Sequence, residues 1–180
     1  NTNVGSYGVS AAIAETQNYT VANAPSTTLT INQRALTVTT DSKTKTYGDT
    51  DPILTGSNNL TAYDAAQIGW NYTAQSYAGN AGNYTLTAAA TDANNRLANY
   101  VITNNNGTLT VDKKNITASF STPLIRTYGD ANPDVNYSNF NFSGLVGSDS
   151  ASLFTGVSTN FGGVGANTNV GSYGVSAMIA

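Results

Sequence analysis

The chain repeats part of itself almost without change. Residues 1–14 read NTNVGSYGVSAAIA and residues 167–180 read NTNVGSYGVSAMIA, so a single substitution separates the two copies. The first copy starts at position 1 and the second at position 167, which is an offset of 166. Because chance does not produce such a match, the chain is one long period followed by a short overlap. The sequence therefore predicts a tandem array, in which each repeat packs mainly against its neighbours.

A weaker repeat of about half that length lies inside the long period. The motif TYGD occurs at 46–49 and again at 127–130, so its copies are offset by 81. The sequence TLTI at 28–31 returns as TLTV at 108–111, an offset of 80. Both offsets are close to 83, which is half of the long period of 166. We infer two diverged modules, A and B, that alternate along the array.

The ends of the chain fall inside modules. Residues 1–34 are predicted to be the C-terminal part of a preceding B module, residues 35–114 a complete A module, and residues 115–180 the N-terminal part of the next B module. Residues 15–34 have the sequence that would continue that last module. Two arrangements stay open: one continuous polypeptide, or separate chains that complete one another by strand donation.

Alternation of apolar and polar residues is the main signal for secondary structure. Leu36 and Val38 alternate with threonines, as do Tyr84 and Leu86, which is typical of strands with one buried face. Asn (24) and Thr (27) make up 51 of the 180 residues, and we assign them to outer strand faces and turns. The pattern predicts a mostly β protein of elongated, antiparallel modules.

Two short segments have helical features. Residues 60–68 (LTAYDAAQI) are rich in alanine and begin with a possible cap, and residues 148–154 (SDSASLF) occupy the corresponding place in module B. The sequence leaves two architectures open for each module: an immunoglobulin-like sandwich, or a β-grasp-like sheet with one short helix.

Composition argues against catalysis and against two kinds of partner. The chain contains no His and no Cys, which removes the usual general base and the thiolate nucleophile. It has only 7 Lys and Arg, whereas nucleic-acid binding needs clustered cations. It also lacks the apolar run of about 18 residues that a transmembrane helix needs. We predict no enzyme activity, no nucleic-acid partner and no membrane insertion.

The order of motifs in each module resembles a known repeat family. Module A contains, in order, ALTV (35–38), KTYGDTDP (45–52), AGNY (81–84), NYVI (99–102) and TLTV (108–111). This series resembles the MBG-type repeat, also called the YGX type. Such repeats occur in tandem in large bacterial surface adhesins and filamentous-haemagglutinin-like exoproteins.

The resemblance implies a structural repeat outside the cell. It predicts a stalk, spacer or matrix scaffold of a secreted bacterial surface adhesin or extracellular fibre, with neighbouring repeats as its main partners. Two alternatives stay open: an adhesive module that binds a host or matrix glycan or protein, and a strand-donating subunit of a polymeric fibre.

Three groups of residues are candidate sites. A structural turn is predicted in both modules from Tyr47, Gly48, Asp49, Pro52, Tyr128, Gly129, Asp130 and Pro133. A calcium site is the metal alternative, because oxygen-bearing side chains alternate at Asp130, Asn132, Asp134 and Asn136; otherwise no cofactor is expected. A glycan contact could use Trp70 and Tyr72, which share one strand face, although a core role is the other interpretation of Trp70.

Overall fold

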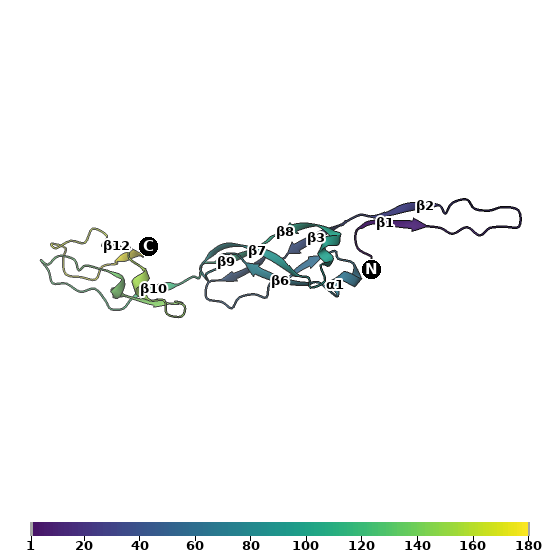
Figure 1. The fold of residues 1–180 in the computed structure, drawn as a ribbon. Coiled ribbons are helices and arrows are strands. Elements are labelled where there is room, and N and C mark those ends of the chain that lie inside the picture. Colours follow the sequence, from purple (N-terminus) through teal and green to yellow (C-terminus); the bar gives the residue numbers. More distant parts are fainter. Residues whose placement is uncertain (1, 180) are drawn as a thin grey trace. The chain divides into compact units, whose positions relative to one another are not determined.

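The structure is a computed structural model that describes residues 2–179. Residues 1 and 180, at the ends of the two predicted outer modules, lie outside the described residues. The chain forms two compact units. The first comprises Asn1–Lys45 and Thr50–Asp112, and the second comprises Thr46–Asp49 and Lys113–Ala180. In both units the regular secondary structure is mostly strand, as the alternation predicted (Figure 1).

One sheet of the first unit has three strands. Strand β3 (Arg34–Thr40) lies between β5 (Gly56–Asn58) and β8 (Tyr100–Asn105), in the order β5-β3-β8. The β3–β5 pair is antiparallel, but β3 and β8 run parallel. The prediction of antiparallel modules therefore fails at the β3–β8 pair. Nearly the whole module separates β3 from β8, and such a long connection lets the chain return in the same direction.

The other sheet of the first unit has four strands. Its order is β4 (Lys43–Thr46), β9 (Gly107–Asp112), β7 (Gly82–Thr91) and β6 (Gly69–Ala74). Strand β9 thus lies between two strands that precede it in the chain. The β7–β9 pair is antiparallel and places Tyr84 opposite Leu109.

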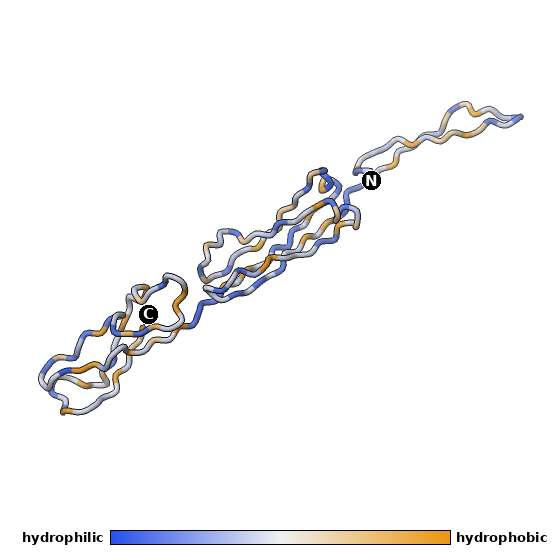
Figure 2. The backbone as a smooth tube through the Cα atoms, turned by 90° about the horizontal axis from the view of Figure 1, so that it is seen from below, coloured by the Kyte–Doolittle hydropathy of each residue, from blue (hydrophilic) through white to orange (hydrophobic). Residues whose placement is uncertain are grey.

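The two sheets of the first unit share one core. Its fully buried apolar residues are Leu36, Val38, Ile68, Leu86, Tyr100, Leu109 and Val111. Trp70 of β6 and Ala88 of β7 pack against the cluster of Leu36, Val38 and Tyr100, so side chains from both sheets meet. Hydrophobic residues recur along the strands of this unit (Figure 2). Of the two architectures, this arrangement corresponds to the sandwich.

The predicted helices are shorter than their segments. In the first unit, helix α1 spans only Ala62–Ala65, with Thr61 as its N-cap, and a 3-10 helix, η1, spans Arg96–Asn99. In the second unit, the segment 148–154 contains only the 3-10 helix η3 (Ala151–Leu153). Each of these is about one turn.

A two-stranded hairpin precedes β3. Strands β1 (Gly5–Ser10) and β2 (Ser26–Ile31) run antiparallel, with Tyr7 opposite Leu29. Every residue of β1 is exposed, and only the last residue of β2 is half-buried. Figure 1 shows the two strands side by side, joined by a long loop. The hairpin therefore contributes almost nothing to the core of the first unit.

The second unit has two pairs of strands. Strand β10 (Thr117–Phe120) pairs with β11 (Phe140–Ser143), and β12 (Val157–Asn160) pairs with β13 (Ser176–Ile179); both pairs are antiparallel. A 3-10 helix, η2 (Tyr137–Asn139), leads into β11. Among the described residues of this unit, Phe140 is the only fully buried large apolar side chain. Its core is correspondingly small.

Candidate functional site

Both copies of the YGD motif form the same turn. Gly48 and Gly129 have φ angles of 86° and 96°, a region that glycine adopts without a steric penalty. The backbone N–H of Asp49 donates to the carbonyl oxygen of Thr46 over 3.0 Å. The backbone N–H of Asp130 donates to that of Thr127 over 3.1 Å. The glycine and the aspartate thus occupy equivalent places in the two turns.

The other members of the motif have different surroundings. The hydroxyl of Tyr47 donates to Oδ2 of Asp149 over 3.0 Å within the second unit, and this hydrogen bond raises the pKa of Tyr47. Tyr128 is exposed, and Pro52 and Pro133 are half-buried. A structural role for the whole motif stays a prediction.

Beside the first turn lies a small polar cluster that the sequence did not indicate. Nζ of Lys45 lies 2.6 Å from Oδ1 of Asp51, and the hydroxyl of Tyr77 donates to the same oxygen over 2.7 Å. The hydrogen bond from Lys45 lowers the pKa of Asp51, and the same bond raises the pKa of Lys45. Because the three residues come from separate segments, only the folded chain brings them together.

The calcium candidate has side chains that already bond to the protein. Nδ2 of Asn132 donates to the carbonyl oxygen of Val164 over 2.7 Å, and Oδ1 of Asn136 accepts from the backbone N–H of Ser138 over 2.9 Å. Within residues 2–179, no three His, Cys, Asp or Glu side chains gather as metal ligands would. Calcium binding by Asp130, Asn132, Asp134 and Asn136 stays a prediction.

The glycan candidates Trp70 and Tyr72 share one face of β6, as predicted from their spacing, and both are half-buried. Trp70 packs against the core, and its Nε1 is buried without a hydrogen-bond partner. The ring of Tyr72 lies so close to Gly56 that a Cβ there would be 2.6 Å from it. Only part of each ring is open to a sugar, and the glycan contact stays a prediction.

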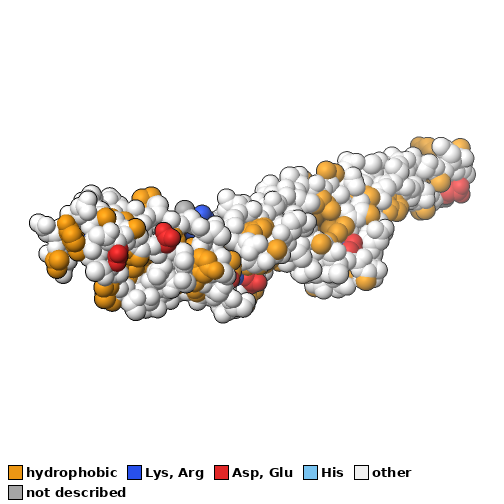
Figure 3. All heavy atoms as spheres, turned by 90° about the vertical axis from the view of Figure 1, so that its left-hand side faces the viewer, with side chains coloured by type: hydrophobic (Ala, Val, Ile, Leu, Met, Phe, Trp, Pro, Cys, Tyr) orange, Lys and Arg blue, Asp and Glu red, His pale blue; other side chains and the backbone are white. Residues whose placement is uncertain are grey.

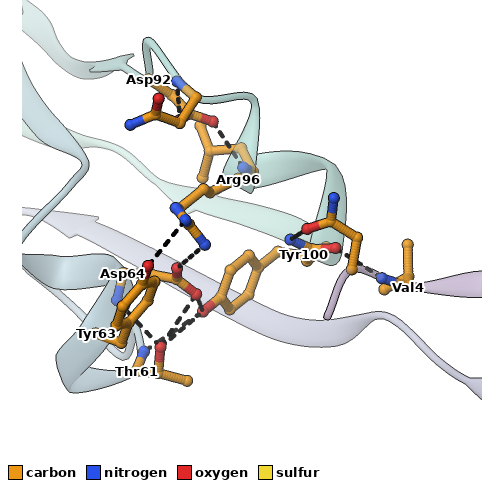
Figure 4. Close-up of polar contacts among 11 residues, drawn as sticks. Val4, Thr61, Tyr63, Asp64, Asp92, Arg96 and Tyr100 are labelled. Atoms are coloured by element: carbon orange, nitrogen blue, oxygen red, sulfur yellow. Dashed lines mark hydrogen bonds and ion pairs between the residues drawn. The ribbon is translucent and has the colours of Figure 1, made fainter. Parts of the chain in front are cut away.

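A buried carboxylate organises one end of the first unit (Figure 4). Asp64 of α1 is 6% exposed, and its Oδ2 accepts a 2.6 Å hydrogen bond from the hydroxyl of Tyr100. The hydroxyl of Thr61 donates to the same oxygen over 3.1 Å, and Nη1 of Arg96 lies 3.5 Å from Oδ1. The guanidinium carbon of Arg96 also lies 4.6 Å from the ring centroid of Tyr63. The network ties α1, η1 and β8 together.

Only part of that network has a sequence signal. The spacing of Thr61 and Asp64 is that of a helix N-cap and its third residue, and the backbone N–H of Asp64 does donate to the Thr61 hydroxyl. Tyr100 and Arg96 are far away in the sequence, and nothing in their neighbourhood marks them as partners of Asp64.

The second unit contains an open cavity of about 1030 Å³. Most of its lining residues belong to segments 120–128 and 168–175. Its apolar lining side chains include Phe120, Leu124, Ile125, Phe161, Val170 and Val175. We call this cavity the strand groove. Its volume is at the upper end of the roughly 300–1,000 Å³ of usual small-molecule sites.

Comparison of the two units explains the strand groove. By the spacing of the TYGD motifs, residues 124–127 correspond to β4, which in the first unit pairs only with β9. By the shared G-x-Y motif, residues 171–175 correspond to the first half of β7, which also pairs with β9. Neither segment is a strand in the second unit. The strand groove therefore lies where a counterpart of β9 would lie.

The fold and the repeated turn define a class: a tandem array of small, mostly β modules. A domain family described as MBG domain (YGX type) matches residues 36–110 and 116–179. The chain belongs to this family, whose members are repeats found in bacterial surface proteins. The matched segments cover roughly 70 residues each, which is shorter than the half-period of 83.

The family is a non-catalytic repeat domain, and no catalytic family matches the chain. No curated protein and no solved structure matches it either. Among the helices that the structure describes, none has the length and apolar character to cross a bilayer.

Proposed function

We propose that the chain is a spacer repeat of a secreted bacterial surface protein. A complete module (35–114) is followed by the N-terminal part of the next (115–180) and preceded by the C-terminal part of another (1–34). The observation that carries this proposal is the tandem match of one domain family, together with the return of the sequence of residues 1–14 at 167–180. Such an array converts sequence length into reach, because each repeat contacts mainly its neighbours.

The surface composition supports this role. On the face drawn in Figure 3, few acidic or basic side chains and scattered hydrophobic ones are visible among uncharged side chains and backbone. Charged residues make up only 9% of the chain, compared with about 25% in ordinary domains. A spacer needs solubility and length rather than a specific ligand site, and Asn and Thr on outer strand faces provide that solubility.

The test is a length measurement on arrays of one, two and four long periods. Strand β7 has ten residues, which at about 3.3 Å per residue span about 33 Å. We expect the largest dimension in small-angle X-ray scattering to grow by about 30–40 Å for each added module. A dimension that levels off as periods are added would contradict the spacer.

A second measurement separates the spacer from the adhesive alternative. A spacer should show no saturable binding on a glycan array. Saturable binding that Trp70→Ala abolishes, with the fold preserved by circular dichroism, would favour the adhesive module instead. Protease treatment of intact native cells should remove the repeat if it lies at the surface, and should spare it if it lies inside.

A further inference from the structure

The first YGD turn packs against a segment of the following module. Thr46–Asp49 belong to module A by sequence, but in the structure they are part of the second unit. There the hydroxyl of Tyr47 donates to Oδ2 of Asp149 over 3.0 Å, and both residues are half-buried. The two residues are 102 positions apart in the chain. The turn therefore has a partner in module B, outside its own repeat.

Gly48 lies directly against the same segment. A Cβ at this position would be 2.6 Å from both γ carbons of Val146, so a side chain here would force Val146 to move. Gly129 has a similar φ, 96° compared with 86°, yet nothing lies within 4 Å of a Cβ built there. The backbone angle favours glycine in both turns. Only at Gly48 does the packing of another residue require glycine as well.

The partner segment is a closed turn of its own. The backbone N–H of Asp149 donates to the carbonyl oxygen of Val146 over 2.9 Å, and Gly147 between them has a φ of 57°. The YGD turn is closed in the same way, by the bond from Asp49 to Thr46. Because local hydrogen bonds already order both turns, their contact costs little further conformational entropy.

Completion of module B does not remove this acceptor. The sequence LTAYDAAQI (60–68) aligns with LVGSDSASL (145–153), which makes Asp149 the counterpart of Asp64. In the complete module, Oδ2 of Asp64 accepts two hydroxyl groups, and Oδ1 has no hydrogen-bond partner among the described residues. A carboxylate can accept about four hydrogen bonds, and Tyr47 provides one of them to Asp149. Asp149 can therefore bind Tyr47 and a hydroxyl of its own completed module together.

We propose that the first YGD turn is a docking surface for the turn at residues 146–149 of the following module. Tyr47 supplies the donor for the carboxylate of Asp149, and Gly48 leaves the room that Val146 occupies. The motif thus links one repeat to the next, in addition to reversing the chain within its own repeat. The proposal needs only that module B follows module A, so it does not rest on the spacer function.

The first test compares two glycine variants of the full chain by hydrogen exchange. Gly48→Ala and Gly129→Ala place alanine at similar φ angles, so their backbone strain is matched. Only Gly48→Ala adds a Cβ against Val146, and we expect it to speed exchange at residues 146–149 by about fivefold or more. Gly129→Ala should leave that exchange as in the wild type, and Trp70 fluorescence checks that the first unit stays folded. Equal exchange in the two variants would overturn the proposal.

A disulfide measures the same contact directly, because the chain has no native cysteine. A Cβ at residue 48 would lie 3.1 Å from that of Val146, close to the roughly 3.5–4.5 Å of a disulfide. In a glutathione redox buffer, Gly48→Cys with Val146→Cys should form an intramolecular disulfide about tenfold faster than Gly129→Cys with Val146→Cys. Equal rates, or a rate that rises with protein concentration, would contradict docking within one chain.

The hydrogen bond is tested in the chain that carries this first cysteine pair. Tyr47→Phe should lower the equilibrium constant for disulfide closure by about threefold or more, because a bond to a charged acceptor is lost. Tyr128 has the same place in the second turn and is 59% exposed, so Tyr128→Phe should have no effect. The same contrast should appear in an array of two long periods, where module B is complete. Equal effects of the two variants, or a contrast that vanishes in the array, would refute the role of Tyr47.

Discussion

Replacing Tyr100 by phenylalanine removes one oxygen atom from a buried contact of the first unit. The Tyr100 hydroxyl donates to Oδ2 of Asp64 over 2.6 Å, and the two residues are 5% and 6% exposed. A hydrogen bond to a charged group contributes about 1.5–3 kcal/mol to stability. The carboxylate keeps the hydroxyl of Thr61 and the more distant Arg96 as partners, so we expect the loss to stay within that range.

The single tryptophan provides the assay. Trp70 packs against the core of the first unit, so its fluorescence reports the unfolding of that unit. For a domain of about 60–100 residues, 1 kcal/mol corresponds to about 4–8 °C in Tm. Tyr100→Phe should therefore lower the fluorescence-detected Tm by roughly 6–24 °C.

Tyr63→Phe is the matched control. Its hydroxyl accepts from Nη2 of Arg96 over 3.0 Å, but the side chain is 47% exposed, so we expect less than about 0.5 kcal/mol. In an Asp64→Asn background, Tyr100→Phe should cost clearly less than it does alone, because the charged acceptor is gone. Equal losses for the two tyrosine variants, or full additivity with Asp64→Asn, would refute the assignment.

Three further substitutions test other parts of the first unit by the same fluorescence. Leu86→Ala should lower the free energy of unfolding by about 2–5 kcal/mol because Leu86 is fully buried, whereas Val9→Ala, at the equivalent but 45% exposed hairpin position, should change it by less than about 0.5 kcal/mol. The backbone N–H of Leu97 donates to the carboxylate of Asp92, and this hydrogen bond is the main cause of the lowered pKa of Asp92. The ionised carboxylate therefore stabilises the fold at pH values above its ordinary pKa of 3.8. This stabilisation is lost as the pH falls through the lower pKa of the folded state. Asp92→Asn should remove that part of the acid sensitivity, which urea titrations at pH 7 and pH 3 will show; an unchanged pH dependence would contradict it. Gly107→Ala would place a Cβ 2.6 Å from a backbone oxygen of β3 and should destabilise the unit by more than about 1 kcal/mol. If the urea midpoint of this variant equals that of the wild type, Gly107 and β3 are not closely packed.

The sequence predicts the faces of strands better than their partners. Leu36 and Val38 alternate with threonines and are buried as expected, because alternation indicates which face of a strand is buried. Alternation carries no information on the neighbouring strand, and the parallel β3–β8 pair was therefore missed. The position of β9 between β4 and β7 was likewise not predictable from any local pattern.

The candidate sites show the same difference between local and long-range features. The YGD turns are local, so glycine and its neighbours were sufficient to predict them at Gly48 and Gly129. In the Asp64 network, Tyr100 lies 36 positions from Asp64, and only the folded chain brings its hydroxyl to the carboxylate. The strand groove became visible only when the strand order of one unit was compared with the other.

The strand order of the first unit also bears on how it emerges during synthesis or secretion. Strand β3, an early strand of this unit, pairs with the late strand β8. Strand β4 pairs with β9, which is the last strand of the unit. Most of the module must have left the ribosome or a secretion pore before either sheet can close. Contacts between sequence-distant strands also slow folding. A chain of such modules would thus remain threadable while in transit and become rigid one module at a time, each when its final strand comes free.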